Sequence, residues 1–109
     1  MTSYFQVAST VSSQEEALRL ARGATEDRLA AGVQIIGPIR SIYWWAGKIQ
    51  EAEEWQLLMK TTADALPALE SYIQANHSYE VPEIIATPII AGSAEYLSWV
   101  SAETTRDRS

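Results

Sequence analysis

The sequence predicts an α+β fold in which an antiparallel sheet packs against helices. Three observations support this class: strand-like apolar runs alternate with segments of helical periodicity, a long aromatic run ends in an Ala-Gly-Lys turn, and Gly, Pro or Ser residues mark most of the breaks. The chain has 109 residues, of which 47% are hydrophobic and 20% charged, as is typical of one globular domain. We therefore predict a single domain over residues 1–109, ordered over about 4–103 and frayed over 104–109.

The first part of the chain is predicted to form a strand followed by a helix. Residues 4–11 are rich in aromatic and β-branched side chains, which favour a strand. Overlapping Ser-x-x-Glu capping boxes begin at Ser12 and Ser13, so the helix begins at about residue 13. Apolar residues at helical spacing continue to Leu29, and the helix ends by Gly32.

A long β-hairpin is predicted in the middle of the chain. Residues 33–45 form its first strand, with a bulge or bend at Gly37-Pro38, and residues 49–62 return antiparallel after a turn. Both faces of the first strand carry apolar or aromatic side chains, so neither can stay wholly in water. Acidic residues precede apolar ones in the second strand, so we expect a solvated tip and a buried base.

The rest of the chain is predicted to form a helix, a strand and a short last helix. Asp64 is a good N-cap for the first of these helices. Residues 84–91 predict a strand, in which Pro88 marks an edge or a bulge, and Gly92-Ser93 turns the chain into the last helix. The predicted order is β-α-β-β-α-β-α, which is the ferredoxin-like plan with two main helices on one face of the sheet.

The other face of this sheet and the hairpin lack cover in the predicted monomer. The hairpin aromatics are Tyr43, Trp44, Trp45 and Trp55. Because large exposed apolar patches mark interaction sites, we expect the chain to associate. The alternative is that the last helix covers this face alone.

Composition excludes several classes of function. The formal charge of −6 argues against binding nucleic acid or an anionic membrane surface, since both need a basic patch. The chain has no cysteine, which rules out disulfides and thiolate ligands within it. No window approaches the roughly 20 apolar residues of a membrane span, and no basic segment precedes an apolar run at the N-terminus. We therefore expect a cytoplasmic protein.

Residues 77–83 form the most informative stretch, because they combine the only histidine with carboxylates, a phenol and a rigid proline. Pro82 prevents a continuous helix, so the polar groups lie on a loop. His77, Glu80 and Glu83 are candidate ligands for a divalent transition metal such as Cu(II) or Zn(II), and a neighbour's hairpin could add Glu51, Glu53 and Glu54. The alternative is a hydrogen-bonded histidine in a helix-to-strand connection. No nucleophile or oxyanion feature accompanies His77, so no enzymatic activity is predicted.

Several motifs resemble those of the CutA family, the divalent-cation tolerance proteins. They are DRLAAGV at residues 27–33, SIYWWAGKI at 41–49, KT at 60–61, HSYEVPE at 77–83 and YLSW at 96–99. The resemblance covers nearly the whole chain. It implies a ferredoxin-like protomer in a PII-like homotrimer, in which strands of neighbours extend one another's sheets. It also implies a non-enzymatic protein that binds or responds to divalent metal ions, with copper the usual one.

The chain departs from the family pattern at Gly32, where many members have cysteine, and at Ser78, where many have proline. Loss of the thiol removes a soft ligand, so a Cu(I) thiolate site is not expected. A second function is a PII-like ligand cleft between subunits, and a third is a structural trimer that docks other proteins. The residues of that cleft, or of a plain subunit interface, are Tyr43, Trp44, Trp45, Lys60 and Tyr79.

Overall fold

The structure, a computed structural model, describes residues 2–105. Seven elements follow one another along the chain: β1 (Tyr4–Val11), α1 (Gln14–Glu26), β2 (Gly32–Trp45), β3 (Lys48–Thr62), α2 (Leu66–Asn76), β4 (Ile85–Ile89) and α3 (Ala94–Glu103). This order confirms the predicted α+β, ferredoxin-like plan.

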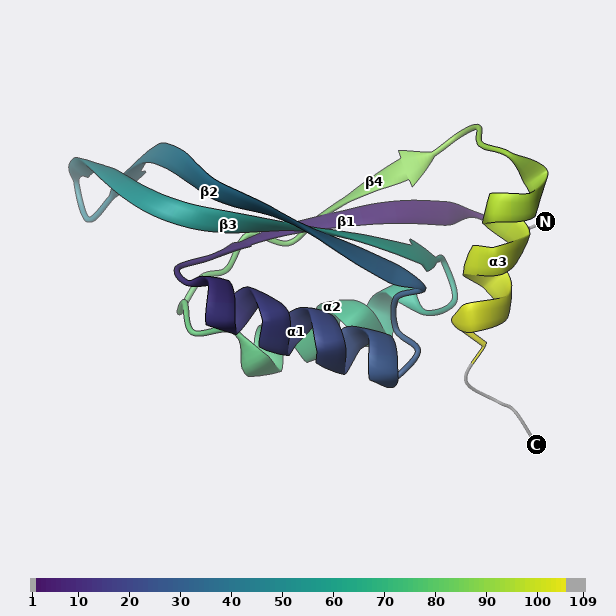
Figure 1. The fold of residues 1–109 in the computed structure, drawn as a ribbon. Coiled ribbons are helices and arrows are strands. Elements are labelled where there is room, and N and C mark those ends of the chain that lie inside the picture. The colour runs from purple at the N-terminus through teal and green to yellow at the C-terminus, as the bar shows by residue number, and fades with distance from the viewer. Residues whose placement is uncertain (1, 106–109) are drawn as a thin grey trace.

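The four strands form one antiparallel sheet in the order β2-β3-β1-β4. Helices α1 and α2 lie side by side against one face of this sheet (Figure 1). Strand β4 pairs only with β1 among the described strands, so Pro88 lies on an edge strand, as predicted. An edge tolerates proline because a missing N–H on the outer side breaks no ladder hydrogen bond.

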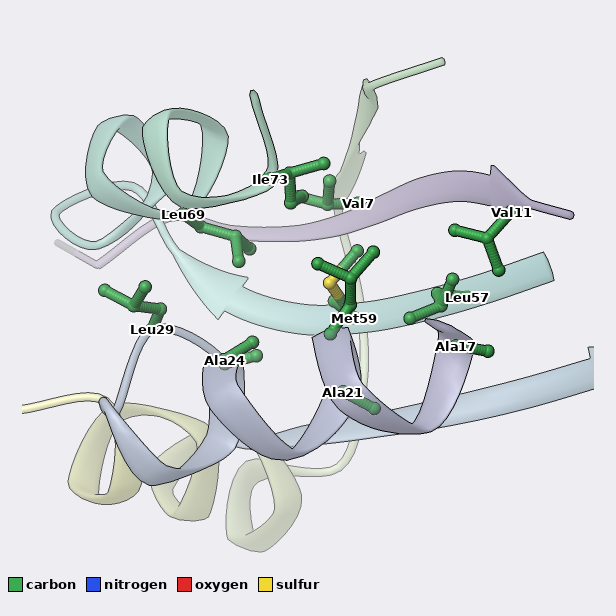
Figure 2. Packing of buried hydrophobic residues seen from close by; sticks show 12 residues of the cluster. Val7, Val11, Ala17, Ala21, Ala24, Leu29, Leu57, Met59, Leu69 and Ile73 are labelled. Atoms are coloured by element: carbon green, nitrogen blue, oxygen red, sulfur yellow. The ribbon is translucent and has the colours of Figure 1, made fainter. Parts of the chain in front are cut away.

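The hydrophobic core lies between the sheet and helices α1 and α2 (Figure 2). Its largest fully buried side chains include Leu20, Leu57, Met59, Leu69 and Ile73. The inner face of α1 carries alanines, which let the helix approach the sheet closely. Burying each large apolar side chain contributes about 1.5 to 3 kcal/mol, so this layer is the main source of stability within one chain.

The two main helices begin in different ways: a side chain caps α1, whereas α2 has no side-chain cap. Ser13 is the N-cap of α1, because its hydroxyl accepts a hydrogen bond from the Glu16 N–H at 3.1 Å. The prediction that Asp64 caps α2 is wrong. Helix α2 begins after Ala65 with no side-chain cap, and the Ala65 N–H donates to the hydroxyl of Thr62 at 3.3 Å.

Helix ends also differ in part from the prediction. Helix α1 ends at Glu26, before the apolar Leu29, because Arg28 adopts φ 58° and turns the chain toward β2. Thr104, predicted to lie in a frayed tail, is buried and donates its hydroxyl to the Val100 carbonyl at 2.7 Å. Residues 106–109 of that tail lie outside the described residues.

The hairpin of β2 and β3 projects beyond the helices, which gives the molecule principal extents of 48 × 28 × 21 Å (Figure 1). The pairing shifts register between Ile36 and Ile39, which confirms the predicted bulge at Gly37-Pro38. Ala46 and Gly47 both have positive φ at the turn, as a tight hairpin requires. Trp55 does not lack cover, contrary to prediction, because it packs partly buried against the core.

Helix α3 covers only one end of the face opposite α1 and α2. There the hydroxyls of Tyr4 and Ser101 lie 2.7 Å apart, and the Trp99 ring packs over Gly32. Ile36 and Ile85, whose strand partners place them on this same face, are 44% and 55% exposed. The alternative in which the last helix covers the whole face is therefore wrong.

Candidate functional site

The loop after α2 is held in place by His77, whose side chain is fully buried. Its Nε2 lies 2.8 Å from the carbonyl oxygen of Thr10, and its Nδ1 accepts a hydrogen bond from the Tyr79 N–H at 3.0 Å. A carbonyl can only accept and an amide N–H can only donate, so the ring is the neutral tautomer with its proton on Nε2. Both ring nitrogens are thus engaged within the protein.

Glu16 ties the same loop to the start of α1. This buried carboxylate accepts hydrogen bonds from the Ser78 N–H at 2.9 Å and from the Ser78 hydroxyl at 2.8 Å. Its Oε2 also lies 3.9 Å from the Nδ1 of His77. The sequence indicates Glu16 only as a capping-box residue. Its contact with Ser78 could not be predicted from the sequence, because Ser78 lies 62 residues further along the chain.

Tyr79 links the loop to the hairpin. Its hydroxyl donates to Oε2 of Glu54 at 2.6 Å, and its ring lies 4.9 Å from the His77 ring, centroid to centroid. Burial, followed by the hydrogen bond to Glu54, raises the pKa of Tyr79 well above its usual value. The phenol therefore stays protonated and keeps donating to Glu54 at physiological pH.

A groove of about 800 Å³ lies between this loop and the open face of the hairpin. Its carboxylates are Glu54, Glu80 and Glu83, and its aromatic walls are Tyr43, Trp45 and Tyr79. The remaining lining residues are Thr10, Ser41, Ile42, Ser78 and Val81. No lysine or arginine is among the described residues that line the groove, so its charged groups are all anionic.

The structure brings together most, but not all, of the predicted site residues. Tyr43, Trp45, Tyr79, Glu80 and Glu83 line the groove, while His77 is sealed beneath it. The other two predicted cleft residues, Trp44 and Lys60, do not line it.

Strand geometry explains the positions of these two residues. Trp44 alternates with Tyr43 and Trp45 on β2 and so faces the opposite side of the hairpin, where it is 71% exposed. Lys60 is paired with Gly32 at the other end of the hairpin, and its ammonium donates to the Gln34 side chain at 3.2 Å. Burial lowers the pKa of Lys60.

The predicted metal ligands do not converge into one cluster. In residues 2–105, no group of three or more His, Asp or Glu side chains lies close enough to hold a metal ion. To act as a ligand, His77 would have to give up one of its two hydrogen bonds. One chain therefore presents the carboxylates of Glu80 and Glu83 as oxygen donors in the groove, together with Glu54, whose Oε2 already accepts a hydrogen bond from Tyr79.

The sequence indicates Glu54 only as one of three hairpin carboxylates that a neighbouring subunit could supply, whereas the structure places it in the groove of its own chain. It lies in the acidic run of residues 51–54, which predicts a solvated hairpin tip, yet Glu54 is only 4% exposed. Strand alternation is the one signal that separates it from its exposed neighbour Glu53, since adjacent residues on a strand face opposite sides.

None of the helices in the part of the chain that is described has the length and apolar character to cross a membrane.

Comparison with known proteins gives a consistent result. Residues 5–103 match the family described as CutA1 divalent ion tolerance protein. The divalent-cation tolerance protein CutA of Thermus thermophilus is 46% identical over 98 residues, which are 90% of this chain and 95% of that protein. The crystal structure of CutA1 from Oryza sativa matches with a TM-score of 0.92 at 41% identity and covers 96% of each chain.

A rice sequence named Protein CutA 1, chloroplastic, is 44% identical over 95 residues, or 87% of this chain. Those residues are 54% of the rice protein, so the chain spans about half the length of that relative. The family match at residues 5–103 contains every residue that lines the groove.

Proposed function

Because the chain belongs to the CutA1 divalent ion tolerance family, we propose that it is a non-enzymatic homotrimer that binds a divalent transition-metal ion. The observation that carries this proposal is the groove, which Glu54, Glu80 and Glu83 line and which has no lysine or arginine among its described lining residues. This concentration of negative charge attracts a divalent ion, and individual carboxylate oxygens can serve as its ligands.

Glu80 and Glu83 are the ligands in this proposal, and His77 positions the loop that carries them. Both carboxylates are exposed and border the groove, whereas the imidazole is buried and hydrogen-bonded on both sides. Carboxylate oxygens suit Cu(II) or Zn(II) less specifically than a histidine cluster does. The described residues of one chain supply only part of a ligand set, so water or a neighbouring subunit completes it.

Assembly into a homotrimer is supported by the exposed apolar surface of the hairpin. The side chains concerned are Ile42 at 67% exposure, Tyr43 at 41%, Trp44 at 71%, Trp45 at 50% and Ile49 at 63%. A cluster of this kind at the end of a projecting hairpin marks an interaction surface. The open face of the sheet, with Ile36 and Ile85 half-exposed, extends that surface.

The environment of His77 supports a protein without catalytic activity. Its nitrogens pair with backbone groups of Thr10 and Tyr79, rather than with a hydroxyl that the imidazole could activate. Residence in the cytoplasm stays a prediction, since the rice relative is named chloroplastic.

Calorimetric titration of Cu(II) into wild type and into the double variant Glu80→Gln/Glu83→Gln tests the metal proposal. Wild type is expected to bind with a dissociation constant of about 1 µM, or about −8 kcal/mol. The double variant should bind at least tenfold more weakly, because amides carry no charge. Glu53→Gln, an exposed change outside the groove, is the control and should bind like wild type.

Two results would contradict the assignment. Equal and weak binding by all three proteins would remove the specific metal site. Loss of binding in His77→Ala, with unchanged binding in the double glutamate variant, would move the ligand to the imidazole.

A second candidate function is binding of a small molecule in the same groove. Its volume of about 800 Å³ and its aromatic walls favour this candidate, since a bare ion uses neither.

A further inference from the structure

We propose that Glu54 of one subunit and Lys60 of the next form an ion pair at every interface of the assembly, so that a second copy of this chain completes the buried end of the groove. The inference rests on the proposed homotrimer and deepens it, because it names two side chains that meet between subunits. It does not rest on the metal site, since it leaves Glu80 and Glu83 as the metal ligands.

The first argument is the incomplete pairing of Glu54. The residue is 4% exposed, and its Oε2 accepts a hydrogen bond from the neutral hydroxyl of Tyr79. Among the described residues, no basic side chain lies within 4.0 Å of this carboxylate, and Oε1 has no hydrogen-bond donor. A buried carboxylate is costly unless a cation or several donors compensate for its lost hydration.

The free oxygen of Glu54 is accessible from the groove. Over residues 2–105, the hydroxyl of Ser9 is the single side-chain polar atom that is both sealed from solvent and without a partner. Oε1 of Glu54 also lacks a partner, so it keeps contact with solvent, and Glu54 lines the groove. The raised pKa of Tyr79 keeps the phenol protonated on Oε2, which leaves Oε1 for a cation. Once a neighbour covers this surface, that cation has to come from the neighbour.

Lys60 is a cation without a counter-ion. Its ammonium donates to the side-chain oxygen of Gln34 at 3.2 Å, and among the described residues no carboxylate lies within 4.0 Å of it. Burial lowers the pKa of Lys60, so the charged form is already partly desolvated in one chain. Cover by a neighbouring subunit adds to this cost unless the neighbour supplies an anion.

Both charged residues lie on the open side of β3. Strand residues alternate between two faces, and Leu57 and Met59 of this strand are buried in the core against the helices. Glu54 and Lys60 have the opposite parity, and the pairing of β3 with β1 continues without a bulge. The two charges therefore lie on the surface that the proposed trimer buries.

One chain cannot join the two charges. Glu54 and Lys60 are six residues apart on one extended strand, which is about 20 Å at a rise of about 3.3 Å per residue. An ion pair needs a nitrogen and an oxygen within about 4 Å of each other. In a closed trimer, each interface joins two different patches of the chain, so a patch with an unpaired anion can meet a patch with an unpaired cation.

Lys48 is the alternative partner, because it lies on the same side of β3 and is also six residues from Glu54. Lys48 is exposed beside the hairpin turn, however, where water hydrates its ammonium. Arg40 already pairs with Glu51, and the arginines of α1 lie on the helical side of the sheet (Figure 1). Among the described basic residues, Lys60 is therefore the one for which assembly creates the need of a carboxylate.

A crystal structure of the assembled wild-type protein measures the pair directly. We expect the Nζ of Lys60 to lie within about 4 Å of the Glu54 carboxylate of the neighbouring subunit at every interface. A trimer in which the two groups lie further apart, or in which Lys48 takes the place of Lys60, would overturn the inference and leave the homotrimer intact. This measurement does not depend on the folding of any variant.

A double-mutant cycle tests the same pair in solution. Its members are wild type, Glu54→Gln, Lys60→Gln and the double variant, and sedimentation velocity in urea gives the dissociation constant of the trimer. Each single change should weaken the trimer, because it leaves the other charge buried and unpaired. The double variant should be about tenfold more stable than the two single effects predict when multiplied, since residues about 20 Å apart in one chain act independently and coupling requires contact between chains.

The control cycle replaces Lys60→Gln with Lys48→Gln and should show no coupling to Glu54→Gln. Independent effects of Glu54→Gln and Lys60→Gln, in a wild-type protein that sediments as a trimer, would overturn the ion pair alone. A wild type that sediments as a monomer would overturn both the pair and the proposed homotrimer. Copper titration of the Glu80 and Glu83 variants tests the metal site separately.

Discussion

At the scale of single residues, the hydrogen bonds of His77 determine what its loop can do. The buried imidazole bridges the Thr10 carbonyl on β1 and the Tyr79 N–H. It thereby fixes the residue that donates to Glu54 in the groove. This geometry gives His77 a role in shaping the site, whether or not its imidazole binds a metal ion.

His77→Ala is expected to lower the free energy of unfolding by about 2 to 4 kcal/mol. The change leaves two backbone groups without partners and creates a cavity beneath the groove. Urea denaturation followed by circular dichroism measures the difference. The exposed change Gln74→Ala on α2 is the control, expected within about 0.5 kcal/mol of wild type. A loss below that value for His77→Ala would show that the imidazole does not hold the loop.

The sequence predicts part of the site at this scale. It identifies residues 77–83 because rare polar residue types coincide there with a proline. It does not identify the partners of His77 and Tyr79, because Thr10 and Glu54 lie 67 and 25 residues away along the chain. Only the folded sheet brings those groups together.

At the scale of elements, the start of α1 supports both the core and the site. Ser13 caps the helix, and Glu16, one turn later, holds Ser78 of the loop. An acidic residue in the first turn also interacts favourably with the helix dipole. The position of the loop therefore depends on where this helix begins.

Ser13→Ala should destabilise the protein by about 1 kcal/mol, within the usual range of 0.5 to 2 kcal/mol for loss of an N-cap. Ser12→Ala is a matched control, since Ser12 fits the same sequence pattern but is exposed and does not cap the helix. Thermal melting of both variants gives the comparison. Equal melting temperatures would mean that the cap hydrogen bond contributes nothing measurable.

Elements were more predictable than their boundaries. Periodicity and turn residues predict the order of strands and helices correctly, because those patterns reflect burial on one side of each element. The cap of α2 could not be predicted in this way. Asp64 fits the sequence pattern of an N-cap, but the helix begins one residue later, and the Ala65 N–H donates to the hydroxyl of Thr62 at the end of β3.

At the scale of the whole molecule, the projecting hairpin carries an apolar surface that one chain does not bury. Its apolar side chains are exposed at the end of a molecule that is 48 Å long. Burial of this surface requires another molecule, and the proposed homotrimer supplies it.

Trp44→Ser combined with Ile49→Ser should shift the protein from trimer toward monomer. These two residues pair across the hairpin and are 71% and 63% exposed, so their loss removes little from the fold of one chain. Analytical ultracentrifugation should give wild type a mass of three 12.1 kDa chains and the double variant a lower mass. Leu18→Ser, a 43% exposed change on α1, is the control. An unchanged mass for the double variant would exclude this surface from the assembly.

The most direct test of the proposed metal site is an anomalous difference map from crystals grown with Cu(II), recorded at the copper absorption edge. We predict one strong peak in the groove, within coordination distance of the Glu80 or Glu83 carboxylate, in every subunit. Peaks elsewhere on the surface, or none at all, would contradict the claim that this groove is the site of the divalent cation.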